Sequence, residues 1–387
     1  MKKIVIFGST GSIGTSLMNI IKNDKKNFKI ELISANRNYK KLIKQAKFFN
    51  VKNLIIIEKN SFLKAKKILK NDTIKIYNNF NSFKEIFKNK KIDYTMSAIT
   101  GFKGLKPTLD IIKFTNVIAI ANKESIICGW NLIKKNLEKY KTKFIPVDSE
   151  HFSIWSLIDK RRYDNIEEVY LTASGGPFRT YPLNQFNNIT PRKALNHPNW
   201  SMGKKISIDS ATMMNKVFEI IEAKKIFNLK YEQLKILIHP HSYLHAIVKF
   251  NNGLTKMLIH DTNMVIPIFN SLYQKNMNSI KSNNLNINIL NNLELKQVDK
   301  KRFPIIKIID KLTKNDTLFE TVIVSANDNL VNKFLKNEIK FTDISKNLLR
   351  IASLAEFKKY KNIIPKNVGD IEKLADYVGL KIMTMRV

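Results

Sequence analysis

The chain has 387 residues, of which 44% are hydrophobic, so it can bury a large core and its length suggests two or three domains. Its 67 Lys and Arg against 32 Asp and Glu give a formal net charge of +35. The lysines occur in every segment, which indicates a bias of composition more than a nucleic-acid-binding patch, although the charge would attract anionic substrates.

Cysteine content and hydropathy favour a cytoplasmic location. Cys128 is the only cysteine, so an intramolecular disulfide is excluded and a reducing compartment is expected. No apolar run approaches the roughly 18 residues of a membrane span. The N-terminus enters a nucleotide-binding pattern at once, which leaves no room for a signal or transit peptide.

A strand-like run at residues 3–7 ends in the glycine turn Gly8 to Gly14, after which Leu17, Ile20 and Ile21 recur at helical spacing. Strand, glycine turn and helix start are typical of a dinucleotide site, because the helix N-terminus offers unpaired N–H groups to a pyrophosphate. The spacing is G-x-x-G-x-x-G instead of G-x-G-x-x-G, so a structural glycine turn remains an alternative.

The second apolar run, residues 28–33, indicates which cofactor the turn would bind. No acid stands after it, where NAD-type sites hold a ribose hydroxyl, and Arg37 stands there instead. An arginine suits a 2′-phosphate, so NADPH is favoured over NADH. Because arginine is common in surface loops, the residue could also be unrelated to a cofactor.

Further apolar runs at residues 53–57, 94–99 and 117–121 alternate with lysine-rich helical segments. This alternation predicts a Rossmann-like, doubly wound parallel sheet over about the first 150 residues of an α/β protein. Asn122-Lys123-Glu124-Ser125 follows the last run, where polar groups are well placed for a ligand, although a plain helix cap is equally ordinary.

The stretch Pro146 to His151 places Asp148 and Glu150 at a strand-to-helix junction. Two carboxylates are the hard ligands that Mg²⁺ or Mn²⁺ selects, although acids also favour the first turn of any helix. In the helical pattern after residue 207, Asn215, Glu219 and Glu222 fall at i, i+4 and i+7 and share one face. They predict a third metal ligand, or else a solvated polar stripe.

Two other stretches are open to two interpretations each, and a third pattern is not a site. Ser174-Gly175-Gly176 is either an anion nest or a plain turn. The loop 197–203 places Trp200 between a proline and a glycine, as a lid or as a core residue. His239, His241 and His245 match no common zinc spacing, so a zinc role is rejected.

The composition changes from Asn276 to Arg302 into an Asn-, Lys- and Leu-rich stretch that indicates a linker. Beyond it, apolar residues at helical spacing predict a small helical domain. The expected order is an NADPH-binding domain at 1–150, a central α/β catalytic domain at 151–277 with its lid loop at 197–203, a linker at 278–302 and a C-terminal helical domain at 303–387.

At this point the motifs form a recognisable series. The chain carries, in order, GSTGSIG, ANKES, PVDSEH, SGGPF, HPNWSMG, DSATMMNK and IEA. This series resembles the 1-deoxy-D-xylulose 5-phosphate reductoisomerase family, closely from Met1 to about Ser242 and more loosely beyond. The resemblance implies an NADPH- and metal-dependent enzyme of the non-mevalonate isoprenoid pathway that rearranges and reduces a sugar phosphate, and it implies a homodimer.

The resemblance also implies roles for individual residues. A single Mg²⁺ or Mn²⁺ would bind Asp148, Glu150 and Glu219, and Lys123, Ser149, Glu150 and His197 would hold the reacting part of the substrate. The substrate phosphate would fall to Ser174, Ser210, Asn215 and Lys216, beneath Trp200. Cofactor contacts would come from Thr10, Gly11, Ser12, Ile13, Asn36, Arg37, Asn38, Asn122, Glu124 and Gly203.

The chain departs from the family's pattern at three positions. Asn36 and Val217 stand where glycine is usual, and Asp328 stands where glutamate is usual. None of the three is an implied metal or phosphate ligand, but Asn36 puts the adenosine contact in doubt. Two other classes of function remain for comparison: another NADP-dependent Rossmann dehydrogenase acting on a phosphorylated sugar, and a nucleic-acid-binding protein, for which no reading motif is present.

Overall fold

The computed structural model describes residues 1–88, 90–158, 163–274 and 278–385. The chain divides into two compact units, neither of which is continuous in sequence. The N-terminal unit comprises Met1–Ser125, Asn131–Asp148 and Met264–Ile280. The C-terminal unit comprises Ile126–Trp130, Ser149–Asn263 and Lys281–Val387.

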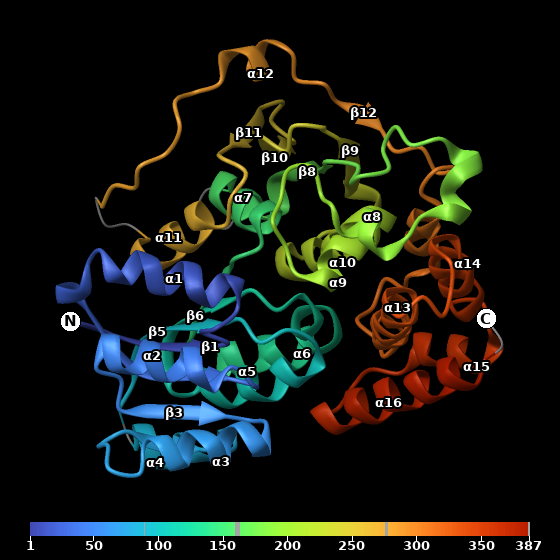
Figure 1. The fold of residues 1–387 in the computed structure, drawn as a ribbon. Coiled ribbons are helices and arrows are strands. Elements are labelled where there is room, and N and C mark those ends of the chain that lie inside the picture. The colour runs from blue at the N-terminus through green and yellow to red at the C-terminus, as the bar shows by residue number, and fades with distance from the viewer. Residues whose placement is uncertain (89, 159–162, 275–277, 386–387) are drawn as a thin grey trace. The chain divides into compact units, whose positions relative to one another are not determined.

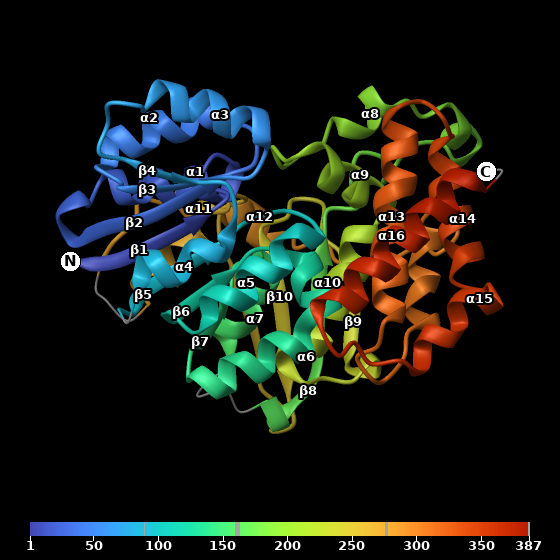
Figure 2. The same ribbon diagram turned by 90° about the horizontal axis from the view of Figure 1, so that it is seen from below.

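The N-terminal unit is built on a parallel sheet of seven strands in the order β4-β3-β2-β1-β5-β6-β7 (Figures 1 and 2). The doubly wound parallel sheet expected from the sequence is therefore confirmed. The strand order reverses beside β1, and such a switch point is where parallel sheets bind ligands. The strands are β1 (Lys2–Phe7), β2 (Phe28–Ala35), β3 (Asn53–Ile56), β4 (Lys75–Tyr77), β5 (Ile92–Ser97), β6 (Thr115–Ile120) and β7 (Lys143–Pro146).

Helices flank this sheet, as Figures 1 and 2 show. They are α1 (Ser12–Lys22), α2 (Tyr39–Phe49), α3 (Lys59–Ile68), α4 (Phe83–Phe87), α5 (Leu105–Ile112), α6 (Lys123–Tyr140) and α11 (Val265–Tyr273), with short 3-10 turns η1 (Lys25–Asn27), η2 (Phe80–Ser82) and η3 (Phe102–Gly104). Helix α11 comes from much later in the chain and packs against α1. Its Ile268 and Leu272 join the buried core formed by β1 and α1.

The C-terminal unit contains a mixed sheet of five strands in the order β11-β10-β8-β9-β12. Strands β8 and β9 are parallel and the other neighbouring pairs are antiparallel. Their bounds are β8 (Ile166–Ala173), β9 (Leu234–Ile238), β10 (Leu244–Phe250), β11 (Thr255–Ile259) and β12 (Lys296–Gln297). Strand β10 is buried along almost its whole length, so the sheet forms part of this unit's core.

Helices make up the rest of the C-terminal unit. They are α7 (Ser149–Leu157), α8 (Pro191–Leu195), α9 (Lys204–Thr212), α10 (Met214–Phe227), α12 (Ile287–Asn291), α13 (Phe319–Leu335), α14 (Phe341–Ile351), α15 (Ala355–Lys358) and α16 (Val368–Thr384), with 3-10 segments η5 (Tyr163–Asn165), η6 (Leu183–Asn188), η7 (Tyr231–Gln233), η8 (Pro304–Lys311) and η9 (Lys359–Asn362). The helical character expected for the C-terminal residues is confirmed. None of the helices in the described ranges has both the length and the apolar character needed to cross a membrane.

The division into units bears on the domain boundaries expected from the sequence. Met264–Ile280 belongs with the N-terminal unit, although the sequence placed residues 264–277 in a central domain and residues 278–280 in a linker. The segment expected to be a linker contains α12 and β12, and β12 pairs with β9. Residues 275–277, where one expected boundary falls, lie outside the described residues. The four-part division therefore stays a prediction.

Candidate functional site

The glycine turn begins directly after β1, at the switch point of the parallel sheet. Gly8 has a φ of +71°, and a Cβ on it would lie 2.5 Å from the carbonyl oxygen of Ala98. Only glycine fits both the backbone conformation and the available space. Helix α1 then starts at Ser12 after Gly11, which has no side chain with which to cap it. The first N–H groups of α1 are therefore suited to bind an anion.

Side chains of α2 hold the back of this turn. Ser9 Oγ donates to Gln45 Oε1 at 2.8 Å, and Gln45 Nε2 donates to the Ser9 carbonyl at 2.9 Å. One turn earlier on α2, Lys41 Nζ donates to the carbonyl oxygen of Thr10 at 3.1 Å and to Thr15 Oγ1 at 2.8 Å. The sequence did not predict Lys41 or Gln45, because neither belongs to the glycine motif.

The residues after β2 are exposed, as a cofactor-contacting segment must be. Asn36, Arg37 and Asn38 all lie at the surface. Asn38 also has a structural role, since its Oδ1 accepts a hydrogen bond from the backbone N–H of Lys41 at 3.2 Å and caps α2. Residues 36–38 include no acid, which agrees with a site for a 2′-phosphate at Arg37, although the Glu58 carboxylate lies near enough to Arg37 to interact with its charge.

Asn122, Lys123 and Glu124 lie at the start of α6. Asn122 is almost fully buried, and its side chain caps α6 and donates to the carbonyl oxygen of Gly101 at 2.9 Å. The side chain of Asn122 thus acts as a helix cap, which was one of the two interpretations from the sequence. Lys123 Nζ forms an ion pair with Asp148 Oδ2 at 2.6 Å, within the N-terminal unit. Glu124 is buried in the first turn of the helix.

Two carboxylates predicted as metal ligands converge in the C-terminal unit. Glu150 from α7 and Glu219 from α10 each present an oxygen, and these oxygens lie within 4.8 Å of one another. Lys216 Nζ donates to Glu150 Oε1 at 2.7 Å and to the Thr172 carbonyl oxygen at 2.5 Å, and it forms an ion pair with Glu219. The side chains of Glu219 and Lys216 are 1% and 5% exposed, so each charge requires the other.

The pKa of Lys216 reflects these neighbours. Burial acts to lower the pKa of this lysine, but the carboxylates of Glu150 and Glu219 outweigh burial, and the pKa is raised. The ammonium therefore stays charged at neutral pH. Two carboxylates therefore share this one ammonium, and oxygen donors of this kind are suited to bind a cation.

Asp148 precedes this cluster in the chain. Only Ser149 separates it from Glu150, so the two Cα atoms lie within about 7 Å of each other in any conformation of the backbone. Ser149 begins α7, and its Oγ donates to the carboxylate of Glu150. Asp148, Ser149 and Glu150 thus form one continuous polar segment.

Residues on and beside α10 hold Glu219 in place. Asn215 Nδ2 donates to the Glu219 carboxylate from one turn earlier, as the predicted shared face requires. His151 Nε2 donates to the backbone carbonyl of Glu219 at 2.9 Å, and its Nδ1 lies 3.9 Å from the carboxylate of Glu222. Glu222 is buried and therefore not part of a solvated stripe. The role of His151 was not predicted from the sequence, although this residue lies next to Glu150 in the same motif.

A second polar cluster brings together three residues predicted to bind substrate. His197 Nε2 lies 3.1 Å from both Ser174 Oγ and Ser210 Oγ. Its Nδ1 accepts hydrogen bonds from the backbone N–H groups of Asn199 and Trp200, so the proton of the neutral ring is on Nε2. Burial lowers the pKa of His197 to about 4, which keeps the ring neutral at physiological pH.

The glycines after Ser174 fit closely against this cluster. Gly176 has a φ of +63°, and a Cβ on it would lie 2.9 Å from the backbone oxygen of Ser210. The backbone N–H of Gly176 donates to Ser174 Oγ at 3.0 Å. The turn therefore fixes the Ser174 hydroxyl beside His197.

The loop 197–203 connects this cluster to α9. Trp200 is half-buried and lies edge-on to His245, with ring centroids 6.3 Å apart. Gly203 is exposed at the N-cap of α9, with open space around its Cα. A partly exposed indole on a loop that begins at His197 is compatible with the lid role.

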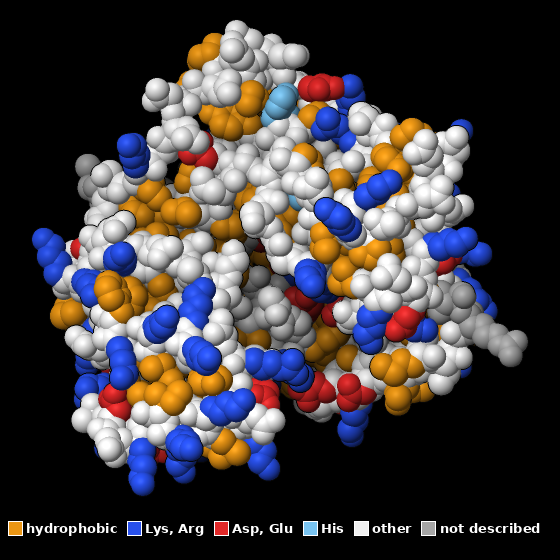
Figure 3. All heavy atoms as spheres, in the orientation of Figure 1, with side chains coloured by type: hydrophobic (Ala, Val, Ile, Leu, Met, Phe, Trp, Pro, Cys, Tyr) orange, Lys and Arg blue, Asp and Glu red, His pale blue; other side chains and the backbone are white. Residues whose placement is uncertain are grey.

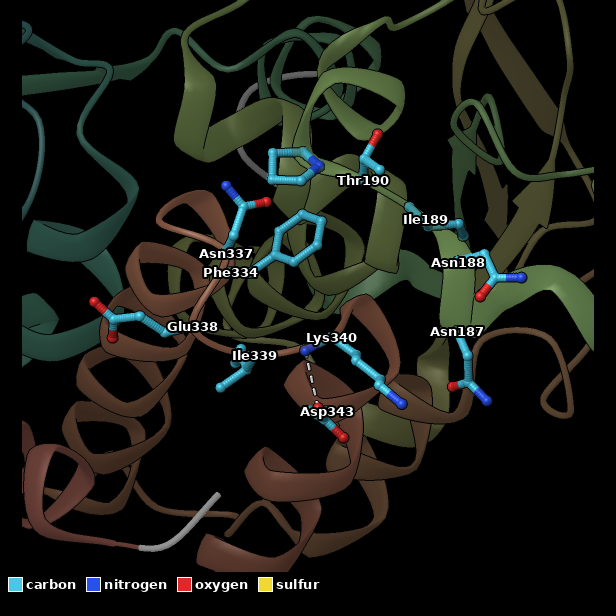
Figure 4. Close-up of a pocket in the computed structure, with 11 residues that line it drawn as sticks. Asn187, Asn188, Ile189, Thr190, Phe334, Asn337, Glu338, Ile339, Lys340 and Asp343 are labelled. Atoms are coloured by element: carbon cyan, nitrogen blue, oxygen red, sulfur yellow. Dashed lines mark hydrogen bonds between the residues drawn. The ribbon is translucent and has the colours of Figure 1, made fainter.

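A hollow of about 450 Å³ lies elsewhere in the C-terminal unit, between η6 and α8 on one side and the α13–α14 connection on the other (Figure 4). Asn187, Thr190, Phe334 and Lys340 are among its lining residues, and Lys340 N donates to Asp343 at 2.9 Å. None of the predicted site residues lines it, so the carboxylate and histidine clusters remain the candidate site.

The amino-acid sequence is similar to those of known proteins. Sequence profiles of 1-deoxy-D-xylulose 5-phosphate reductoisomerase match residues 4–129, those of its C-terminal domain match residues 144–227, and a further DXP reductoisomerase C-terminal domain matches residues 260–377. The 1-deoxy-D-xylulose 5-phosphate reductoisomerase of Pelagibacter ubique is 66% identical over 388 residues and covers 100% of both chains. That of Clostridium kluyveri is 38% identical and covers 89% of this chain and 90% of its own.

Solved structures agree with these relatives. The enzyme from Zymomonas mobilis, solved in complex with NADPH, has a TM-score of 0.88 at 30% identity and covers 100% of both chains. A structure titled DOX-P reductoisomerase in complex with NADPH, fosmidomycin and magnesium has a TM-score of 0.88 at 27% identity and covers 99% of this chain and 100% of its own.

The parallel sheet with a glycine turn at its switch point, joined to a second unit rich in buried carboxylates, defines an oxidoreductase of the Rossmann type. Within that class, the chain belongs to the 1-deoxy-D-xylulose 5-phosphate reductoisomerase family.

Proposed function

We propose that this chain converts 1-deoxy-D-xylulose 5-phosphate into 2-C-methyl-D-erythritol 4-phosphate with NADPH and a divalent metal ion, in the non-mevalonate route to isoprenoid precursors. Its family membership over the whole chain supports this reaction. The observation that carries the assignment of the site is the buried Glu150–Lys216–Glu219 cluster, which follows Asp148 by a single intervening residue.

Asp148, Glu150 and Glu219 would hold one Mg²⁺ or Mn²⁺. Their oxygen donors fit the preference of hard dications. When bound, such an ion polarises adjacent oxygens of the substrate. Asn215 and His151 contribute by orienting Glu219, through its carboxylate and its backbone respectively.

Other side chains would hold the substrate. Lys123, Ser149, Glu150 and His197 would meet the oxygens around the reacting carbons, and the neutral His197 would do so as a hydrogen-bond donor through Nε2–H. Ser174, Ser210, Asn215 and Lys216 would bind the phosphate. To reach it, the Lys216 ammonium has to exchange a carboxylate partner for a phosphate oxygen. Trp200 would cover the substrate and exclude water.

NADPH would bind at the glycine turn and supply the hydride. The backbone at Thr10, Gly11, Ser12 and Ile13 would bind the pyrophosphate at the N-terminus of α1. Arg37, between Asn36 and Asn38, would meet the 2′-phosphate. Asn122, Glu124 and Gly203 would complete the site, with Asn122 contributing through its backbone because its side chain caps α6.

The chain would act as a cytoplasmic homodimer. Family membership and the single cysteine support these two assignments, and the charge of +35 is compatible with a small anionic substrate. Sedimentation equilibrium would test the dimer: a mass near that of one chain at micromolar concentration would contradict it.

The activity is tested by following NADPH consumption with 1-deoxy-D-xylulose 5-phosphate, with added Mg²⁺ or Mn²⁺ and after chelation. We expect turnover with the metal, loss of turnover with the chelator, and recovery when metal is restored. Metal-independent oxidation of another phosphorylated sugar with NADP⁺, together with no turnover of 1-deoxy-D-xylulose 5-phosphate, would instead identify a simple Rossmann dehydrogenase.

A further inference from the structure

The segment Ser325 to Asp328 has no part in the proposed chemistry, although its last residue departs from the family's pattern. It lies within α13, in the C-terminal unit. Asn327 is polar and yet 0% exposed, so its amide requires a partner inside the protein. Its Oδ1 has no hydrogen-bond partner among the described residues. Among the described residues, the partner of this amide is therefore the one that its nitrogen binds.

That bond connects α13 to α9. Asn327 Nδ2 donates to Asp209 Oδ1 at 2.7 Å, and Asp209 is itself buried. The other oxygen of Asp209 forms an ion pair with Lys205 Nζ at 3.1 Å. The same ammonium lies 3.0 Å from Asp328 Oδ1. Two residues of α13 therefore hold two residues of α9, Asn327 through a hydrogen bond to a carboxylate, which is the stronger kind, and Asp328 through an ion pair.

Helix α9 carries a residue of the candidate site. Ser210 directly follows Asp209, and consecutive helical side chains point about 100° apart. Asp209 can thus face α13 while Ser210 faces His197, 3.1 Å away. The backbone of Ser210 also has little freedom to move, because the turn at Gly176 packs against it without room for a Cβ.

We infer that Asn327 is a positioning residue for the substrate phosphate: through Asp209 it sets the position of α9, and with it the Ser210 hydroxyl, while Asp328 and Lys205 secure the same helix at its first turn. This inference rests on the proposed function, in which Ser210 binds the phosphate. Asn327 touches neither substrate nor cofactor in this scheme.

The test is a swap of the two partners. The variant Asn327→Asp places two carboxylates against each other. In the double variant Asp209→Asn with Asn327→Asp, an amide and a carboxylate again face each other, and Lys205 still forms its ion pair with Asp328. Asn332→Asp is the matched control, because it makes the same chemical change at an exposed position of α13. For each variant, KM for 1-deoxy-D-xylulose 5-phosphate, KM for NADPH, kcat, the inhibition constant of inorganic phosphate and the melting temperature are measured.

We expect Asn327→Asp to raise KM for the sugar phosphate and the inhibition constant of inorganic phosphate together, by about tenfold or more, because a charged hydrogen bond is replaced by repulsion. KM for NADPH should change little in Asn327→Asp, and Asn332→Asp should have the kinetic parameters of the unmodified chain. The double variant should recover most of the affinity for the sugar phosphate that Asn327→Asp loses. A folded Asn327→Asp variant with unchanged substrate KM, or a rise shared equally by NADPH, would overturn the inference.

Should Asn327→Asp fail to fold, Lys205→Gln tests the same link from the partly exposed side. A smaller, parallel rise in the two substrate-phosphate parameters is expected, and their constancy would count against the inference. The same measurements on the unmodified chain distinguish failure of this inference from failure of the proposed function. If that chain neither turns over 1-deoxy-D-xylulose 5-phosphate nor is inhibited by inorganic phosphate, the proposed function itself is wrong.

Discussion

Glu219 is held by three neighbours with different chemistry. Asn215 donates to its carboxylate, Lys216 pairs with it, and His151 donates to its backbone carbonyl. A carboxylate that is 1% exposed and fixed at both backbone and side chain is suited to bind a metal ion with little reorganisation. Its replacement is therefore the sharpest test at the level of one residue.

Glu219→Gln should leave the fold intact and lower turnover by roughly a hundredfold or more, because a neutral amide is a poor ligand for a hard dication. Binding of Mn²⁺, followed by electron paramagnetic resonance, should weaken in parallel. Glu232→Gln, at an exposed glutamate, is the control. Near-normal turnover by a folded Glu219→Gln variant at low Mg²⁺ would refute the assignment.

Arg37→Ala should narrow the preference for NADPH over NADH. A charged hydrogen bond to phosphate contributes about 1.5–3 kcal/mol, or roughly one to two powers of ten in affinity, and NADH does not make this bond. Steady-state kinetics with both cofactors measure the ratio, and Lys40→Ala removes a nearby exposed charge as a control. Equal use of NADPH and NADH by the unmodified chain would contradict the prediction.

His197 should make stability depend on pH in a defined direction. Its folded pKa of about 4 lies below the ordinary value, so the unfolded chain binds more protons between these two pH values. The stability that the neutral ring contributes is complete above about pH 6.5 and declines as pH falls towards about 4. Urea unfolding at several pH values should show a steeper decline for the unmodified chain than for His197→Gln. Parallel curves would mean that His197 titrates normally.

At the scale of elements, α10 combines a buried packing face with the residues of the candidate site. Val217, where the family usually has glycine, is 0% exposed. It lies two residues from Glu219, about 200° around an ideal helix, so its side chain is expected to pack behind the carboxylate cluster. Burial of this side chain agrees with a packing role.

Val217→Gly should therefore lower the free energy of unfolding by about 1–3 kcal/mol while changing turnover little. The loss combines the greater backbone freedom of glycine with a lost apolar contact. Thermal melts and kinetics on one preparation provide the measurement. An unchanged melting temperature with much faster turnover would place Val217 against the substrate.

The elements that were predicted well are those with a clear pattern in their own residues. Strand β1 and its glycine turn were visible because a buried strand is continuously apolar and Gly8 is required by space and backbone conformation. The membership of α11 in the N-terminal unit was not visible, because it depends on packing against α1 and leaves no mark in the local pattern. The two-residue strand β12 is likewise fixed by its pairing with β9.

At the scale of the whole molecule, the charge has no single location. On the face shown in Figure 3, Lys and Arg side chains are scattered among polar and apolar groups instead of gathered in one patch. This distribution agrees with the interpretation from sequence that the lysines reflect a bias of composition. A diffuse positive field still attracts anions over a distance set by salt.

The value of kcat/KM for 1-deoxy-D-xylulose 5-phosphate should fall as ionic strength rises, while kcat changes less, because salt screens the attraction before binding and has little effect on the bound substrate. A series in sodium chloride, with a non-ionic osmolyte at matched osmolarity as the control, provides the measurement. A kcat/KM that does not change with salt would mean that the net charge has no part in capturing the substrate.

The candidate site was predicted as a set of ligands, but its internal contacts were not. The family resemblance implied Glu150 and Glu219 as metal ligands, and the structure brings their carboxylates together. The sequence could not reveal that Lys216 forms ion pairs with Glu150 and Glu219. Nor could it reveal that His151 donates a hydrogen bond to the backbone of Glu219, or that Asn327 donates one to Asp209. These contacts join residues distant in sequence, and no local periodicity encodes them.

The return of α11 to the N-terminal unit also has a consequence for synthesis of the chain. Its Ile268, Phe269, Leu272 and Tyr273 complete a core whose other buried members are made far earlier, from Ile4 to Val147. On a ribosome that adds about 5–20 residues per second, α11 follows β7 by on the order of 10 s. During that interval the apolar surface of α1 lacks its partner helix. Chaperones that bind exposed apolar segments should therefore engage nascent chains that end between β7 and α11, and release them once α11 has emerged.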